Sequence, residues 1–336
     1  MIARNMETKA SVCCSRMKAQ KIATDLVVLG CLSLGLAGGC ARSGGSGAEP
    51  REPRTALAAA GTTVSAEVNA DERASAERPG GAEHGREALE GASARFAAAS
   101  VDGAFILRRE GAVDRTYGGE LVDARHLPCS TFKIANALIS LEVGAIDGVD
   151  ATLPWDGVRR TFDSWNQDHD LRSAMESSVV WYFQEIARRV GLARMTSWVE
   201  RLDYGDRRVG EEVDLFWLEG PLTISPAEEV DFVDRLLGGR LPVAETTAAS
   251  VREIVPAKAV GDVRVRGKTG TCVFDDERKP HAWLVGWVER GETSLGSFAL
   301  LLTEGRDVDA LVNARWSLAL ELLGDAGLVE PEKIAR

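Results

Sequence analysis

The sequence Ser130-Thr131-Phe132-Lys133 places a hydroxyl and an amine three residues apart at the start of an apolar run. Residues at this spacing lie on the same face of a helix. The run continues to about Val143 and is stopped by Gly144, so it predicts a helix that carries both side chains in its first turn. Taken alone, Ser-x-x-Lys is more often a capped helix end with a solvated lysine.

A second motif lies far downstream. Lys268-Thr269-Gly270 follows the alternating run Val263-Arg264-Val265-Arg266-Gly267, which predicts a strand that delivers a cation, a hydroxyl and a glycine to one edge. By itself Lys-Thr-Gly most often marks a turn. The two motifs in this order point to a serine acyl-transfer enzyme.

The lysine of the first motif is the candidate base. A serine hydroxyl is a poor nucleophile until a base takes its proton, and a lysine can do so only when it is neutral or modified. Lys133 lies between Phe132 and Ile134, and burial there would lower its pKa. A neutral amine can add carbon dioxide to give an anionic carbamate, which can act as a general base.

Charge and composition exclude several other functions. The chain has a formal net charge of -11 and no basic stripe interleaved with aromatics, which argues against nucleic acid or an anionic membrane surface as the main partner. It has 4 His and no Cys/His cluster at metal-ligand spacing, which argues against a zinc hydrolase. Its 336 residues leave room for a targeting segment, a spacer and one catalytic unit.

Three regions are expected along the chain. Residues 1–40 resemble a signal peptide, because the apolar run Leu26–Ala37 is too short to span a membrane. The small residues before Cys40 resemble a lipobox, so we expect an exported, periplasmic protein that is either lipid-anchored at Cys40 or cleaved nearby with Cys40 incidental. Residues 41–85, poor in large apolar side chains, predict a disordered tether, and residues 86–336 predict the catalytic domain.

The catalytic region predicts one sheet, built from both ends of the region, with a mainly helical lobe inserted between them. The sheet lobe is expected at about 86–128 and 255–330, and the helical lobe at about 129–254. Ser225-Pro226-x-Glu228 is a helix start signal. The other predicted elements are helices at Arg86–Ala98, Leu171–Val190, Ala193–Leu202 and Val308–Leu323, strands at Gly103–Arg109 and around Val113–Tyr117, and an antiparallel meander of Val263–Gly267, Trp283–Val288 and Ser297–Thr303 with turns at Asp275–Arg278 and Arg290–Glu292.

Taken together, the motifs resemble those of a class D, oxacillinase-type, serine beta-lactamase. The match runs through Pro128–Ile134, Ser178-Val179-Val180, Tyr204-Gly205-Asp206, Phe216–Gly220, Lys268-Thr269-Gly270 and Arg315, and covers roughly Arg86 to Gly327. The resemblance implies an α/β (α+β) fold of the beta-lactamase and penicillin-binding-protein transpeptidase type, with an antiparallel sheet flanked by helices. One departure is Asp206, which stands where the family has Asn, and we expect it to change local hydrogen bonding only.

The resemblance also implies how the nucleophile is activated. Ser130 would attack the beta-lactam carbonyl, and Lys133, carboxylated on its side-chain nitrogen, would be the base for acylation and deacylation. Trp217 would donate its indole N–H to the carbamate, and Val180 would keep the pocket apolar. An isolated Trp such as Trp217 is otherwise most often a core aromatic. Carbon dioxide or bicarbonate is then needed, and no other cofactor or metal is implied.

Further roles follow from the same resemblance. Ser178, within a predicted helix, would pass a proton toward the lactam nitrogen with Lys268 beside it; a Ser inside a helix otherwise bonds back to its own turn. Thr269, Gly270 and Arg315 would bind the substrate, with Thr269 and Arg315 holding its carboxylate; the alternative for Arg315 is a surface salt bridge. The backbone N–H groups of Ser130 and Thr271 would form the oxyanion hole. Trp165 would line the cleft or serve only in packing.

Cys129 and Cys272 flank the two proposed oxyanion donors, so they are expected to lie near one another. An exported protein meets an oxidising compartment. A disulfide and two small buried thiols both remain open, since disulfide geometry is narrow.

Two related activities compete with the hydrolase. A beta-lactam sensor domain shares the motifs but stays acylated, and it hangs from several membrane helices, whereas this chain has one short apolar segment. A penicillin-binding peptidase more often has Ser-x-Asn in place of Ser178-Val179-Val180 and lacks the Trp217 segment. The sequence leaves open the oligomeric state and the range of beta-lactam substrates.

Overall fold

The computed structural model describes residues 85–273 and 279–333. The predicted signal segment, nearly all of the predicted tether and the turn predicted at Asp275–Arg278 lie outside these residues. Within the described part, no helix combines the length and the apolar character needed to cross a membrane.

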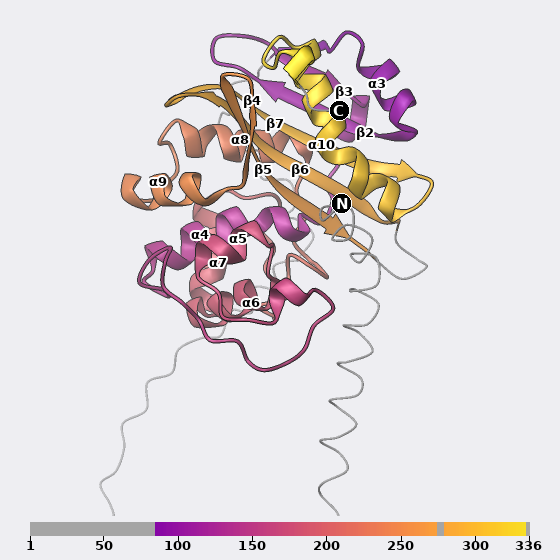
Figure 1. The fold of residues 1–336 in the computed structure, drawn as a ribbon. Coiled ribbons are helices and arrows are strands. Elements are labelled where there is room, and N and C mark those ends of the chain that lie inside the picture. Colours follow the sequence, from indigo (N-terminus) through magenta and orange to yellow (C-terminus); the bar gives the residue numbers. More distant parts are fainter. Residues whose placement is uncertain (1–84, 274–278, 334–336) are drawn as a thin grey trace, which may run out of the picture. The chain divides into compact units, whose positions relative to one another are not determined.

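One sheet joins strands from the two ends of the described chain (Figure 1). Its order is β1-β3-β2-β7-β6-β5-β4. All neighbours are antiparallel except β1 and β3, which pair in parallel. The strands are β1 Arg86–Ala88, β2 Val101–Arg108, β3 Asp114–Tyr117, β4 Ala257–Val260, β5 Val263–Cys272, β6 His281–Arg290 and β7 Thr293–Gly305.

Side-chain alternation along these strands produces two apolar faces. Phe105, Leu284 and Leu300 face the helices α3 Ala92–Ala99 and α10 Val308–Asp325. Ile106 and Val285 face the opposite way, toward α8 Pro226–Leu237 and the other central helices. The central strands are therefore buried on both faces, which makes them a rigid platform for the site.

The helical insertion lies between β3 and β4 and runs from magenta to orange in Figure 1. The 3₁₀ turn Cys129–Phe132 leads into α4 Lys133–Glu142, which is buried along most of its length. The capping box at the start of α8 is formed as predicted, because Ser225 Oγ accepts from Glu228 N and Glu228 Oε2 accepts from Ser225 N. The remaining helices are α5 Leu171–Glu176, α6 Val180–Val190, α7 Leu192–Arg201 and α9 Glu245–Ile254.

The helix predicted over Leu171–Val190 is wrong, because it is interrupted at Ser177–Val179. Ser178 adopts a left-handed backbone with φ 53°, and the Trp165 indole donates to Ser177 O at 2.9 Å. A contact from outside the helix thus stabilises a break that local helix propensity does not predict.

Two smaller differences from the predicted elements also arise from contacts with distant segments. The helix predicted at Arg86–Ala98 begins only at Ala92, because residues 86–88 pair with β3 as a strand. The strand leading to Lys268 does not stop before the motif but continues through it to Cys272, held by pairing with β6. Strand β4 and helix α9 were not predicted, since β4 is short and its residues are mostly exposed.

The insertion and the sheet meet where the 3₁₀ turn packs on β5. Gly270 sits at this contact, and a Cβ there would lie 2.9 Å from Pro128 O and 3.2 Å from Thr131 Cγ2. A backbone oxygen cannot move away as a flexible side chain can, so glycine is required for this close approach.

We therefore predict that Gly270→Ala destabilises the protein by about 1–3 kcal/mol, the usual cost of forcing a methyl group into a packed contact. Gly148→Ala is the matched control, because a Cβ at Gly148 meets nothing within 4 Å. Thermal unfolding of the two variants beside the parent measures the effect. Equal midpoints for all three proteins would contradict the role given to Gly270.

Candidate active site

Ser130 and Lys133 lie side by side, as their spacing predicts. Lys133 Nζ donates to Ser130 Oγ at 2.6 Å. The Lys133 side chain is completely buried, and this burial, reinforced by the charge of Lys268, holds its pKa well below the ordinary lysine value. A lower pKa favours the neutral amine, which has a lone pair to offer next to the hydroxyl.

Aromatic rings pack around Phe132 and Lys133, and one of them carries an N–H donor that is unpaired within the described part of the chain. Trp217 is fully buried and stacks on Phe132 with ring centroids 5.3 Å apart, and the Phe183 ring centroid lies 5.4 Å from Lys133 Nζ. Among the residues that the structure describes, Trp217 Nε1 has no hydrogen-bond partner. A buried indole N–H usually has an acceptor, so this one marks a place where an acceptor can be added.

Ser178 and Lys268 form a second hydroxyl–amine pair. Lys268 Nζ donates to Ser178 Oγ and to Thr269 O, both at 3.0 Å. Burial, followed by the nearby Arg315 charge, lowers the pKa of Lys268 to about 7. Ser178 reaches Lys268 from the break between α5 and α6 rather than from within a helix, which corrects the predicted placement.

Two of the predicted residues support this break. Val180 is the first residue of α6 and packs half-buried against the core. Trp165 is only 7% exposed, and its indole and its carbonyl are both engaged, with Ser177 O and with the Trp181 indole respectively. Trp165 therefore occupies a packing position beneath Ser177–Val179.

Arg315 approaches the site from α10 and is not a surface residue. It is 7% exposed, and its Nη1 donates to Gly270 O at 2.8 Å and to Thr271 Oγ1 at 2.9 Å. Thr269 and Thr271 alternate with Lys268 and Gly270 along β5, so the two threonines share a strand face. The contact between Arg315 and the Thr271 hydroxyl was not predicted.

β4 pairs with β5 only as far as Arg266. Along Lys268–Cys272 the edge of β5 therefore has no partner strand on that side within the described residues, while the turn Cys129–Phe132 packs against β5 at Gly270. An unpaired strand edge offers backbone groups to a ligand. This edge, with Ser130 opposite, is where a substrate can lie.

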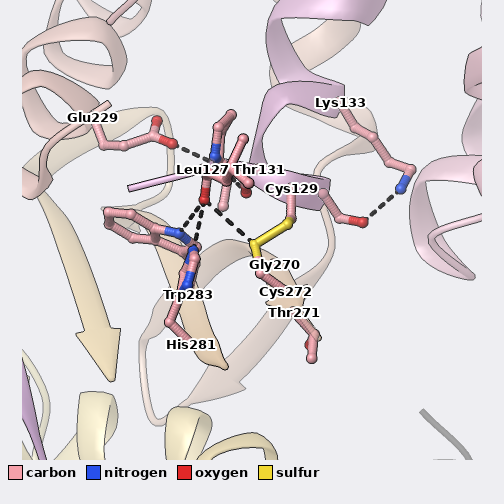
Figure 2. Close-up of a disulfide and its surroundings, with 12 residues drawn as sticks. Leu127, Cys129, Thr131, Lys133, Glu229, Gly270, Thr271, Cys272, His281 and Trp283 are labelled. Atoms are coloured by element: carbon pink, nitrogen blue, oxygen red, sulfur yellow. Dashed lines mark hydrogen bonds between the residues drawn. A yellow bond between two sulfur atoms is a disulfide. The ribbon is translucent and has the colours of Figure 1, made fainter. Parts of the chain in front are cut away.

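Sequence reasoning missed the buried carboxyl group of Glu229. Thr131 Oγ1 donates to Glu229 Oε1 at 2.6 Å, and the Tyr204 hydroxyl donates to the same oxygen at 2.9 Å (Figure 2 shows Glu229 with Thr131). Burial is the largest influence and raises the pKa of Glu229 to about 7. An acidic residue beside Val230, on the apolar face of α8, was the available signal.

Asp206 makes local hydrogen bonds. Its carboxylate accepts from Thr223 N at 3.1 Å, from Thr223 Oγ1 at 2.8 Å and from Arg208 N at 3.2 Å. These bonds close the loop after Gly205, whose φ is 57°.

Cys129 and Cys272 form a disulfide, with Cα atoms 5.8 Å apart (Figure 2). The structure thus decides between the two states that the sequence left open. The link joins the residue before Ser130 to the residue after Thr271.

Glu229 predicts a specific pH dependence of stability. Its pKa is about 7 in the folded protein and near 4.5 when unfolded, so the folded state holds the extra proton between these values and stability falls as pH rises through that window. We expect the free energy of unfolding of the parent to fall by on the order of 3 kcal/mol between about pH 5 and about pH 8. Glu229→Gln, which cannot titrate, should not show this fall.

Denaturant unfolding at both pH values measures this difference. Glu292→Gln, at an exposed hairpin position, is the matched control and should keep the pH dependence of the parent. Parallel pH curves for the parent and Glu229→Gln would show that the carboxyl group is not protonated in this window.

The chain is similar in sequence and structure to several known proteins. The family model described as the penicillin binding protein transpeptidase domain matches residues 102–310. Beta-lactamase OXA-5 of Pseudomonas aeruginosa is 35% identical over 236 residues, which are 70% of this chain and 87% of the relative. The crystal structure of the class D beta-lactamase YbXI from Nostoc aligns with TM-score 0.67 and 32% identity, covering 71% of this chain and 99% of the other.

A protein with a different name also matches. The regulatory protein BlaR1 of Bacillus licheniformis is 31% identical over 231 residues, which are 68% of this chain but 37% of that protein. The enzymes match over most of their own length, and they share with this chain the fold on which the Ser130–Lys133 and Ser178–Lys268 pairs are built. The chain therefore belongs to the class D serine beta-lactamases, within the penicillin-binding-protein transpeptidase family.

Proposed function

We propose that this protein hydrolyses the amide bond of penicillins and related beta-lactams through an acyl-enzyme on Ser130. Ser130 Oγ forms a bond to the lactam carbonyl carbon, the carbon–nitrogen bond breaks, and the nitrogen takes up a proton. Water then cleaves the ester and releases the opened acid. The observation that carries the proposal is the fully buried Lys133 amine 2.6 Å from the Ser130 hydroxyl.

We further propose that Lys133 acts in its N-carboxylated form. Three observations support this: the Lys133 pKa lies well below its ordinary value, the Trp217 N–H has no acceptor among the described residues, and the Phe183 ring centroid lies 5.4 Å from Lys133 Nζ. Val180 would add to the apolar surroundings. When bound, carbon dioxide supplies an anionic oxygen base at Nζ. Lys133 would carry it and Trp217 would hydrogen-bond to it.

The second pair is suited to deliver the proton to the leaving nitrogen. Lys268 donates to Ser178 Oγ at 3.0 Å, so the hydroxyl can give its own proton to the nitrogen and be resupplied by Lys268. A lysine pKa of about 7 makes that transfer less costly than from an ordinary lysine. Ser178 would therefore be the acid that meets the nitrogen.

The remaining groups would bind and polarise the substrate. The backbone N–H groups of Ser130 and Thr271 would stabilise the oxyanion, which is usually the largest electrostatic contribution in acyl transfer. Thr269 and Arg315 would hold the substrate carboxylate, with Gly270 leaving room at the β5 edge. Arg315 already bonds to Gly270 O and Thr271 Oγ1, so it would reach the substrate from a fixed position.

The competing function is a domain that is acylated by beta-lactams but does not release the product. The match with the regulatory protein BlaR1 is the observation that favours it. The two functions share the acylation step and differ only in deacylation.

Turnover distinguishes them. We expect the purified protein to hydrolyse a penicillin and a chromogenic cephalosporin repeatedly, with a rate that rises when bicarbonate is added, and we expect Ser130→Ala to lose both turnover and the covalent adduct seen by mass spectrometry. A single stoichiometric acylation without release would instead assign the regulatory function. The absence of any adduct would contradict the proposed nucleophile.

Trp217 gives a separate test of carboxylation. Trp217→Phe keeps an aromatic ring at this position but removes the N–H, so we expect weaker retention of carbon dioxide and a fall in kcat of roughly tenfold or more without bicarbonate, partly restored by excess bicarbonate. Nuclear magnetic resonance with isotope-labelled bicarbonate detects the carbamate independently of activity.

Trp198→Phe is the matched control, because the Trp198 ring lies on α7 against Arg201. It should leave both the carbamate signal and the rate unchanged. If Trp217→Phe retains the parent's bicarbonate dependence and carbamate signal, the role proposed for the indole is wrong.

A further inference from the structure

The disulfide lies at the contact on which the proposed oxyanion hole depends. Ser130 and Thr271 would supply the oxyanion N–H groups. Cys129 directly precedes Ser130, and Cys272 directly follows Thr271. The linked residues are separated by 143 positions in sequence. The bond therefore joins the turn Cys129–Phe132, which we call the nucleophile turn because it carries Ser130, to strand β5. Each end of the bond is one residue from a proposed donor.

Few other bonds hold these two segments in register. Within the described residues, no backbone hydrogen bond joins the turn Cys129–Phe132 to β5. Instead, Cys129 N donates to Trp217 O at 2.9 Å, which fixes the turn to the helical insertion rather than to the sheet. The Gly270 contact limits how closely the turn and the strand can approach but does not prevent them from separating.

Leu127, two residues before Cys129, is attached to the sheet through β6 rather than β5. Leu127 O accepts from His281 Nε2 at 2.9 Å and from Trp283 Nε1 at 3.0 Å, both on β6, and Cys272 Sγ lies 3.4 Å from the same oxygen (Figure 2). These bonds fix residue 127, before the turn begins. The disulfide extends the attachment to residue 129.

The backbone at Cys129 needs such an attachment. Cys129 has φ 49°, a left-handed conformation that residues other than glycine seldom adopt. A sparsely populated backbone conformation persists when its surroundings hold it in place. Cys129 and Cys272 are 2% and 1% exposed, so the link is also protected from solvent.

We propose that the Cys129–Cys272 disulfide is a positioning element that holds the N–H groups of Ser130 and Thr271 at the separation needed to bind the oxyanion. This inference rests on the proposed function. Because it concerns acylation, it applies equally to a hydrolase and to a domain that stays acylated. Its loss should weaken binding of the transition state more than binding of the substrate.

The test compares the full-length protein with the double variant Cys129→Ala/Cys272→Ala. We expect the acylation rate constant with a penicillin to fall roughly tenfold or more, with a much smaller change in the concentration needed for half-saturation. An aryl boronic acid, whose tetrahedral adduct with a serine places an oxygen in the oxyanion hole, should lose affinity by a similar factor. A merely structural link would lower the unfolding midpoint without these two changes.

Reduction of the native protein provides an internal control. A water-soluble phosphine reaches the buried link during transient local openings of the folded protein, so a long incubation is used. It gives the disulfide two electrons while water supplies two protons and the oxygen of the phosphine oxide, leaving two thiols. Acylation by the reduced protein should fall to the level of the double variant, whereas the double variant should not respond to the phosphine. The other cysteines are present in both proteins, so they cannot account for a difference.

Two results would overturn the proposal. One is a folded double variant with the parent's acylation rate and boronate affinity. If that variant does not fold, the other is a native protein whose disulfide is shown by mass to be reduced, below its unfolding temperature, without loss of acylation. A parent protein that no penicillin acylates would contradict the proposed function itself, whatever the variant does.

Discussion

Lys133 is fully buried, and burial holds the pKa of its amine well below the ordinary lysine value because an unsolvated ammonium is costly. Much of the site depends on this. In the function we propose, the neutral amine would accept a proton or combine with carbon dioxide, and the Ser130 hydroxyl 2.6 Å away would be the nucleophile. The Phe183 ring centroid lies 5.4 Å from Lys133 Nζ, and Trp217, whose N–H has no acceptor among the described residues, stacks on the adjacent Phe132.

Lys133 and Ser130 lie where the sheet meets the helical insertion. The sheet supplies a stiff strand, β5, packed on both faces, and the helical insertion supplies the nucleophile turn and the Ser177–Val179 break. Gly270 sets how closely they approach, and the disulfide prevents them from parting. Glu229 also holds the turn in place by accepting a hydrogen bond from Thr131 Oγ1. Its carboxyl group is buried, and this burial raises its pKa to about 7.

Local patterns predicted the elements whose stability is local. The capping box at Ser225 and the alternation in β5 were readable because caps and strands follow short-range rules. The prediction of one helix over Leu171–Val190 was wrong because the break at Ser178 is stabilised by Trp165, which lies outside that segment. Strand β1 and the buried Glu229 network were missed for the same reason, since each depends on a partner distant in sequence.

From the sequence alone, the spacing of Ser130 and Lys133 indicated the pairing of a hydroxyl with an amine, because helix periodicity acts over a few residues. The order of the later motifs indicated the fold class through their resemblance to the class D beta-lactamases. The complete burial of Lys133, the lowered pKa of Lys268, the unpaired edge of β5 and the choice between thiols and a disulfide at Cys129 emerged only from the folded chain. Desolvation and cross-linking depend on which distant segments come together, and no short-range pattern encodes that.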